Sequence, residues 1–281
     1  MRKATFFFAM ALLLIASLAP MAVHAQSADA QTWSTAITYY TPDASGGSLQ
    51  IRYYAEGSST SIDADPINLS GHKAGSLFIG NVSGMTATFA GGAVLEADVP
   101  IVATAVNIAG GDYPRPLYSG FDPAQASEDF FIPTVLYQKF NTNSLVSIQN
   151  VETSDIDATL KVYAAGATTP TFQQTYAIKA QSAKLVPAAD MSLPAGFTGS
   201  AVVDATGKVV AAAQENEISG RGAKAFEGLA ADAGATTIYM GSMMCQAFAG
   251  NTSYYAIQNA GSATANVEID MYDTTGTKLY T

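Results

Sequence analysis

The sequence predicts an all-β protein made of tandem antiparallel β-sandwich repeats of the immunoglobulin-like kind. Three observations lead to this prediction. Short stretches alternate apolar with polar residues, turn-forming residues separate them, and similar strings of residues recur about 108 positions apart. Units of roughly 100 residues with such short strands are typical of antiparallel sandwiches.

The recurrence is clearest in two pairs of strings. Residues 147–150 (SIQN) return as residues 256–259 (AIQN), 109 positions later. Residues 118–121 (YSGF) return as residues 226–229 (FEGL), 108 positions later. Many matches in the same order at one period indicate a repeated structural unit rather than chance.

Further matches extend the repeat along the chain. Residues 89–95 (FAGGAVL) align with residues 197–203 (FTGSAVV) at a distance of 108, and residues 49–53 (LQIRY) align near 110 or 111 with residues 160–163 (LKVY). Three single residues match at 108, namely Phe131 with Tyr239, Gln138 with Gln246, and Phe140 with Phe248.

Strands are predicted where apolar and polar residues alternate, as in residues 36–40, 159–163 and 267–272. Turns are predicted where Gly, Asp, Ser and Thr gather, at residues 44–47, 204–207 and 273–276. The alanine-rich residues 223–233 are expected to form one short helix.

The repeats divide the chain into four parts. They are a signal peptide (1–25), β-sandwich repeat 1 with its trailing loop (31–127), β-sandwich repeat 2 with its trailing loop (128–236), and an incomplete repeat 3 (237–281). Residues 109–128 and 219–236 are expected to be ordered loops that insert an apolar pair into a neighbouring sandwich. Nothing before Trp33 matches residues 131–140, so the start of the unit is left open.

Repeat 3 reaches Thr281 long before the stage at which repeat 2 is complete. About 45 residues cannot close a sandwich that takes roughly 100. We expect this to be the front portion of a longer protein, and the alternative is that another subunit donates the missing strands.

The first residues predict export. Arg2 and Lys3 precede a run of apolar or small residues from 6 to 18, and residues 23–25 (VHA) suit a signal peptidase. The run is short for a bilayer span, so we expect cleavage before Gln26, secretion or display at the cell surface, and no membrane attachment afterwards.

Charge and composition narrow the partners and the chemistry. Losing Arg2 and Lys3 leaves 11 basic and 23 acidic side chains, a net charge of −12, which argues against nucleic acid as a partner. Cys245 is the single cysteine, so no intrachain disulfide forms, and we expect it to be a small buried hydrophobic residue. A Ser/His/Asp triad would require His72, and no Gly-x-Ser-x-Gly motif accompanies it.

The strings at residues 145–150 (LVSIQN), 193–203 (LPAGFTGSAVV) and 118–121 (YSGF) resemble tandem immunoglobulin-like β-sandwich repeats of large exported bacterial surface proteins. More distantly they resemble the adhesion-associated repeats of bacterial surfaces. The resemblance covers most of residues 31–281. It implies a sandwich fold and an extracellular location, and it implies no catalytic residue.

Acidic side chains are the candidate metal ligands. Asp63 and Asp65 form one pair and Asp155 and Asp157 another, and calcium prefers several oxygen ligands of this kind. The remaining positions of a calcium-binding loop are missing, so solvated turn acids are the simpler interpretation. We therefore expect no cofactor, with calcium as the alternative.

Aromatic side chains are the candidate binding surface for sugars. Trp33, Tyr40 and Tyr54 lie in repeat 1, beside Tyr39 and Tyr53. Neighbours in a strand point to opposite faces, so one residue of each tyrosine pair is expected in the core and the other is free to stack on a ligand.

The favoured function is that of a non-catalytic structural or adhesive repeat protein of the cell surface or extracellular matrix, not an enzyme. Its partners would be neighbouring repeats or other surface proteins. The alternatives are a carbohydrate-binding β-sandwich module that recognises glycans, and a subunit of a strand-exchanged filament.

Overall fold

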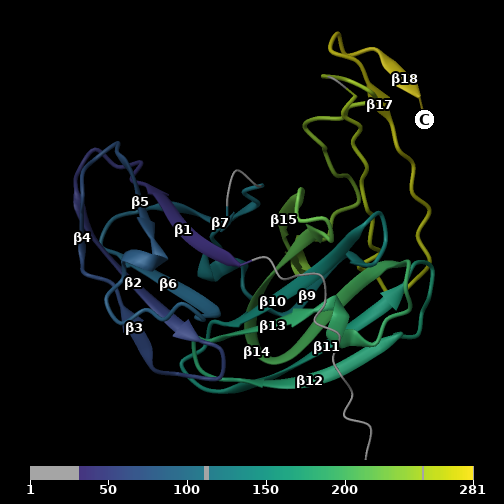
Figure 1. Ribbon diagram of the computed structural model, residues 1–281. Coiled ribbons are helices and arrows are strands. Elements are labelled where there is room, and N and C mark those ends of the chain that lie inside the picture. Colours follow the sequence, from purple (N-terminus) through teal and green to yellow (C-terminus); the bar gives the residue numbers. More distant parts are fainter. Residues whose placement is uncertain (1–31, 111–113, 249, 281) are drawn as a thin grey trace, which may run out of the picture.

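The computed structural model describes residues 32–110, 114–248 and 250–280 (Figure 1). All ladders among these residues are antiparallel, and helix is limited to four short 3-10 turns, so the all-β prediction is confirmed. The 3-10 turns are η1 (Ile79–Asn81), η2 (Pro123–Gln125), η3 (Ala188–Met191) and η4 (Ala231–Ala233). The predicted signal peptide lies outside the described residues. No helix in the described part of the chain is long and apolar enough to span a membrane.

The first sandwich packs two sheets around one core. Its strands are β1 (Trp33–Tyr40), β2 (Gly47–Ala55), β3 (Ser61–Asp63), β4 (Ile67–Leu69), β5 (Ala74–Phe78), β6 (Gly91–Ala97), β7 (Val102–Ala109) and β8 (Leu117–Ser119). One sheet has the order β5-β1-β7-β8, and in the other β2 pairs with β3, β4 and β6. Strand β2 shows the alternation directly, because Leu49, Ile51 and Tyr53 are buried while the residues between them are more exposed.

The second sandwich is built around one long strand. Its strands are β9 (Ser127–Tyr137), β10 (Thr142–Asn150), β11 (Ile156–Ala164), β12 (Phe172–Ile178), β13 (Ala183–Pro187), β14 (Phe197–Glu217), β15 (Ala223–Glu227) and β16 (Leu229–Ala230). The first half of β14 pairs mainly with β9 and β11, and its second half pairs with β10 and β15. Because β14 passes from one layer to the other, its side chains enter the core from both sides.

The strand registers of the two sandwiches correspond at the spacing of the sequence repeat. Leu49 of β2 lies opposite Ala97 of β6, and Ala158 of β11 lies opposite Ala205 of β14. The pairs β1–β7 and β10–β14 are related in the same way. The structure therefore places the counterpart of Leu49 at 109 positions, and the sequence alignment at 110 or 111 was out of register.

The long strand is continuous in only one of the two sandwiches. Strands β6 and β7 together cover the positions that correspond to β14, but they are separated at Pro100, which has no backbone N–H for a ladder. Lys208 occupies the corresponding place in β14. The turn predicted at residues 204–207 was wrong, because β14 runs through it with only a shift of register against β9.

The two segments predicted as loops contain strands. Strand β8 adds to β7, and β15 adds to β14, so the short helix predicted at residues 223–233 was wrong apart from η4. Each segment makes the same backbone hydrogen bond, from Gly120 to Ala103 and from Gly228 to Ala211, both at 2.8 Å. Phe121 packs edge-on against Phe130 in the core of the second sandwich, with ring centroids 6.0 Å apart. The segment after the first sandwich therefore contributes to the second.

Residues 237–248 and 250–280 extend from the second sandwich as a narrow arm, drawn in yellow-green and yellow (Figure 1). Strands β17 (Met271–Tyr272) and β18 (Lys278–Tyr280) form a hairpin across the turn predicted at residues 273–276. The strand predicted at 267–272 forms only at its last two residues. Cys245 is exposed, so the prediction of a buried cysteine was wrong.

Phe197 and Phe89, which occupy matching positions in the two repeats, both pack into their sandwiches. Phe197 is buried at 5 % exposure, and Phe89 is half-buried against the first core. We expect Phe197→Ala to lower the free energy of unfolding by about 3–5 kcal/mol, and Phe89→Ala by less, because more of its ring is already in water. Urea unfolding of each variant measures this difference, and equal losses would contradict the burial described.

Tyr53 is buried in the first core, and its hydroxyl has no hydrogen-bond partner. Burial raises the pKa of Tyr53 to about 12. The unfolded chain, with its ordinary tyrosine pKa near 10, ionises first as the pH rises, so stability falls between about pH 10 and pH 12. We expect Tyr53→Phe to gain about 1 kcal/mol at neutral pH and to weaken this alkaline loss, as measured by urea unfolding across that range.

Candidate functional site

The described residues concentrate specific polar contacts at the junction between the two sandwiches. Gln149, on β10, donates its Nε2 hydrogens to the carbonyl oxygen of Ala93 on β6 at 3.2 Å and to that of Gln181 at 3.1 Å. Ser182, fully buried, donates to the carbonyl oxygen of Ala55 at 2.7 Å. These contacts hold the second sandwich against β2 and β6, and in each of them a side chain donates to a backbone carbonyl group.

The same glutamine contact occurs where the arm meets the second sandwich. Gln258, which lies 109 positions after Gln149 in a similar string, donates to the carbonyl oxygen of Ala201 on β14 at 3.1 Å. Ala201 is in turn the counterpart of Ala93, so donor and acceptor both correspond. The two junctions thus share one hydrogen bond at matching positions.

Asn150 fixes the turn that follows the glutamine. Its side chain is completely buried and donates to the carbonyl oxygens of Ser154 (2.8 Å), Ile178 and Lys179 (both 3.2 Å). Its Oδ1 accepts from the backbone of Glu152 at 2.8 Å.

Asn259 makes two of these contacts in the arm, donating to Ala263 at 2.7 Å and accepting from Gly261 at 3.0 Å. The turn after Gln258 therefore forms as it does after Gln149, although Asn259 is exposed.

Charged groups reinforce both junctions. Lys184 of β13 forms an ion pair with Glu56, which follows β2. At the arm, Glu215 is 2 % exposed and accepts from the Lys224 ammonium at 2.9 Å and the Tyr254 hydroxyl at 3.0 Å. Desolvation lowers the pKa of Lys224, but hydrogen bonds to Tyr254 and Glu215 outweigh it and raise the pKa overall, so this buried carboxylate keeps a charged partner.

The four acidic calcium candidates lie in two different sandwiches. Asp63 and Asp65 are exposed on either side of a buried alanine, and Asp63 lies 3.8 Å from Arg52. Asp155 accepts from Lys179 at 2.6 Å and from the Ala180 amide at 3.0 Å, which lowers the pKa of its carboxyl group.

Asp157 is exposed, and its backbone amide donates to Thr206 at 3.0 Å. Within the described ranges, no three His, Cys, Asp or Glu side chains gather in a way that could hold a metal ion. His72 is exposed in the turn between β4 and β5, where its amide donates to Asp43.

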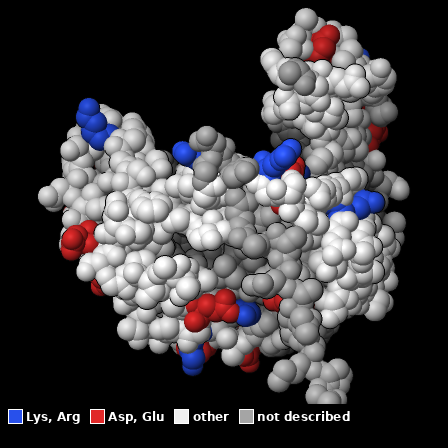
Figure 2. Space-filling model, in the orientation of Figure 1, with Lys and Arg blue, Asp and Glu red and all other residues white. Residues whose placement is uncertain are grey.

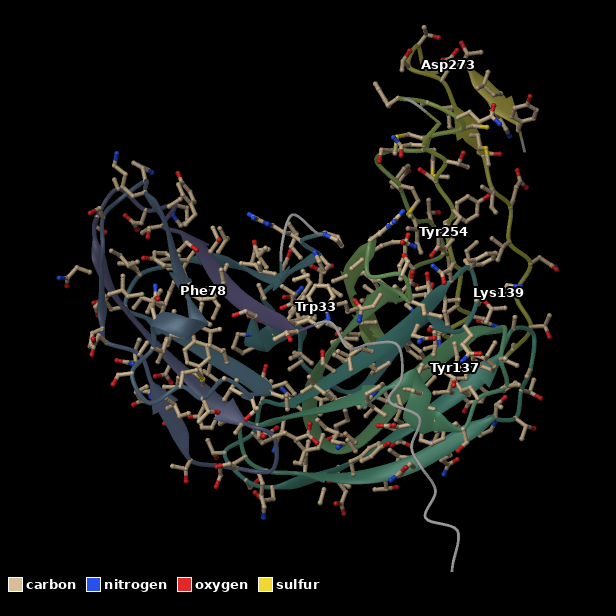
Figure 3. All side chains as sticks on the ribbon, in the orientation of Figure 1. Trp33, Phe78, Tyr137, Lys139, Tyr254 and Asp273 are labelled. Carbon is tan, nitrogen blue, oxygen red and sulfur yellow. The ribbon has the colours of Figure 1, made fainter. Side chains whose placement is uncertain are left out.

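The three aromatic candidates do not form a row. Trp33 and Tyr40 begin and end β1, seven positions apart and therefore on opposite faces, while Tyr54 lies on β2 in the other sheet. Figure 3 shows Trp33 near the middle of the molecule, where the first sandwich meets the second. The expectation for the tyrosine pairs is met, because Tyr39 and Tyr53 contact the core.

Sequence reasoning used the glutamine and asparagine only as markers of the repeat and missed their contacts. The sequence did contain a signal for these contacts. Gln149 with Asn150, and Gln258 with Asn259, each directly follow an apolar residue at the end of a strand whose other repeated residues serve packing. A repeated polar side chain within a buried strand needs partners, so its repetition predicts repeated hydrogen bonds.

Charge does not define a separate binding surface on the face shown in Figure 2, where basic and acidic residues are scattered among uncharged ones. No family model matches the chain, and no curated protein or solved structure matches it. The junction contacts are therefore the candidate functional feature that the geometry supplies.

Asn150 and Asn259 offer a matched pair for testing the turn contacts. We expect Asn150→Ala to lower the free energy of unfolding by about 2–4 kcal/mol, because it strands several buried carbonyl groups. Asn259→Ala should cost less than about 1 kcal/mol, because water reaches the exposed groups that it leaves. Urea unfolding followed by tyrosine fluorescence measures both, and a large loss for Asn259→Ala would contradict these roles.

Proposed function

We propose that the chain is a non-catalytic structural or adhesive repeat protein of the cell surface or extracellular matrix. In this role each immunoglobulin-like repeat unit docks onto the unit before it in a defined orientation. The resemblance to repeats of exported bacterial surface proteins and the predicted signal peptide support the same role.

The observation that carries the proposal is the recurring glutamine contact, Gln149 to Ala93 and Gln258 to Ala201. A junction that repeats this hydrogen bond would place successive units at a similar angle and spacing. A fixed spacing is the property that a stalk or a matrix component needs. The matched strand registers and the equivalent bonds of Gly120 and Gly228 support the same interpretation.

No observation favours the carbohydrate-binding alternative. A flat sugar needs several aromatic side chains on one face, whereas Trp33, Tyr40 and Tyr54 are divided between two sheets and, within β1, between opposite faces.

The fixed junction can be tested with spin labels placed on exposed positions of the two sandwiches and pulsed dipolar spectroscopy. We expect one narrow distance distribution for the full chain. Gln149→Ala should broaden it, because about 1–2 kcal/mol of contact energy is lost and the groups that remain are free to move. Gln173→Ala is the control, because this glutamine is exposed on β12 and makes no hydrogen bond to the first sandwich among the described residues. A broad distribution in the unsubstituted chain would contradict a spacing role.

The location can be tested separately with an antibody against the chain. Labelling of intact source cells, or recovery from their culture medium, is expected. Detection in the cytoplasm alone would contradict the proposed role whatever the junction does.

A further inference from the structure

We propose that the free edge of β6 accepts residues 237–244 from a second copy of the chain as an added antiparallel strand. This pairing is inferred from the strand registers and exposures described above, and it does not rest on the proposed role at the cell surface.

The acceptor is an incomplete edge of the first sandwich. In the second sandwich, the first half of β14 pairs with β11 on one side and with β9 on the other. Strand β6 occupies the corresponding position, yet among the described residues it pairs with β2 alone. A strand edge of this kind presents unpaired N–H and C=O groups that can bind another strand.

The side chains on β6 show the consequence of the missing neighbour. Ala201 and Val203 of β14, which lie opposite residues of β9 in the sheet, are completely buried. Their counterparts Ala93 and Leu95 are only half-buried, although both contact the first core. An added strand would therefore bury apolar surface as well as satisfy the backbone edge.

The donor has the pattern of β9 without its ladder. The three core side chains Phe130, Ile132 and Val135 of β9 are each at most 1 % exposed. Their counterparts one repeat later are all apolar and all exposed, namely Ile238 at 67 %, Met240 at 61 % and Met243 at 42 %.

The turn after the donor also matches the turn after β9. Gln138 and Gln246 share a left-handed backbone, with φ of 50° and 53°, as do Phe140 and Phe248, with φ of 52° and 46°. The chain therefore leaves both segments in the same local conformation, although only β9 has a partner strand.

The register of the added strand follows from the β9–β14 ladder. In that ladder Val202 lies opposite Phe131, and Ala201 lies opposite Ile132. Replacing each β14 residue by its counterpart on β6, and each β9 residue by its counterpart 108 positions later, places Val94 opposite Tyr239 and Ala93 opposite Met240. Charge favours the pairing, because residues 237–244 carry no charged side chain at neutral pH and Glu96 would face Thr237 rather than another acid. The hydrogen bond from Gln149 to Ala93 is compatible with an added strand on β6. In the second sandwich Ala201 accepts the equivalent hydrogen bond from Gln258 while β9 is paired with β14.

We identify the occupant as a second copy of the chain. Within the described part of the chain, residues 237–244 have the apolar pattern of β9 but belong to no ladder. The donor and acceptor surfaces differ, so each copy that donates also keeps its own β6 edge for another copy. Such heterologous pairing builds open chains of molecules rather than closed dimers.

The first test measures mass against concentration for the full chain by light scattering coupled to size exclusion. The average mass is expected to rise at least about twofold from low to high micromolar concentration. Met240→Asp should hold the average mass at the monomer value, because strand addition would bury the new charge in the core of the partner copy. The single chain should still fold, because Met240 is exposed in it. Leu279→Asp is the matched control, because this side chain is similarly exposed outside the donor.

The second test fixes the register by disulfide cross-linking in a Cys245→Ser background. Val94→Cys with Tyr239→Cys is expected to give a ladder of covalent multimers under mild oxidation, and Val94→Cys with Ser242→Cys is expected to give far less. A mass that stays monomeric at all concentrations, association that survives Met240→Asp, or a cross-link formed only within one chain would each overturn the proposal. The spin-label and antibody results for the proposed function stand or fall independently of these outcomes.

Discussion

The second sandwich depends on a single strand, β14, because β9, β10, β11 and β15 all form ladders with it. A strand that runs through both layers connects their hydrogen-bond networks and supplies core side chains to each. Local sequence can favour the extended conformation of β9, β10, β11 and β15. None of these strands completes its backbone hydrogen bonds, however, until β14 is in place. The dependence is visible in residues 250–270, where the turn contacts of Asn259 form while no ladder does.

Pro100 and Gln149 modify this arrangement differently, because Pro100 interrupts a strand whereas Gln149 links two sandwiches. Pro100 divides the equivalent of β14 into β6 and β7, which separates the two sheets of the first sandwich. Gln149 crosses between sandwiches and binds a backbone carbonyl, a partner that survives most substitutions at Ala93. A contact to backbone can therefore be kept at successive junctions while the surrounding side chains change, as it is at Gln258.

The two sandwiches differ in how completely they satisfy buried polar side chains. Asn150 uses both ends of its amide, whereas Thr41, its counterpart in the first sandwich, leaves its hydroxyl buried without a partner. The first sandwich also buries the Tyr53 hydroxyl in this way and has fewer fully buried side chains. The first sandwich is thus the less completely packed of the two.

The sequence by itself determined the all-β class, the approximate spacing of about 108 residues at which similar strings recur, and that one residue of each tyrosine pair enters the core. These depend on local alternation and on recurrence, which can be read along one chain. It did not determine that residues 204–207 continue a strand, that residues 223–227 form β15 instead of a helix, or that Cys245 is exposed. Nor did it show what Gln149 and Asn150 bind. Only the tertiary structure decided these points. The strand that pairs with a segment, the residues that bury a side chain and the acceptor of a hydrogen bond lie far away in the sequence.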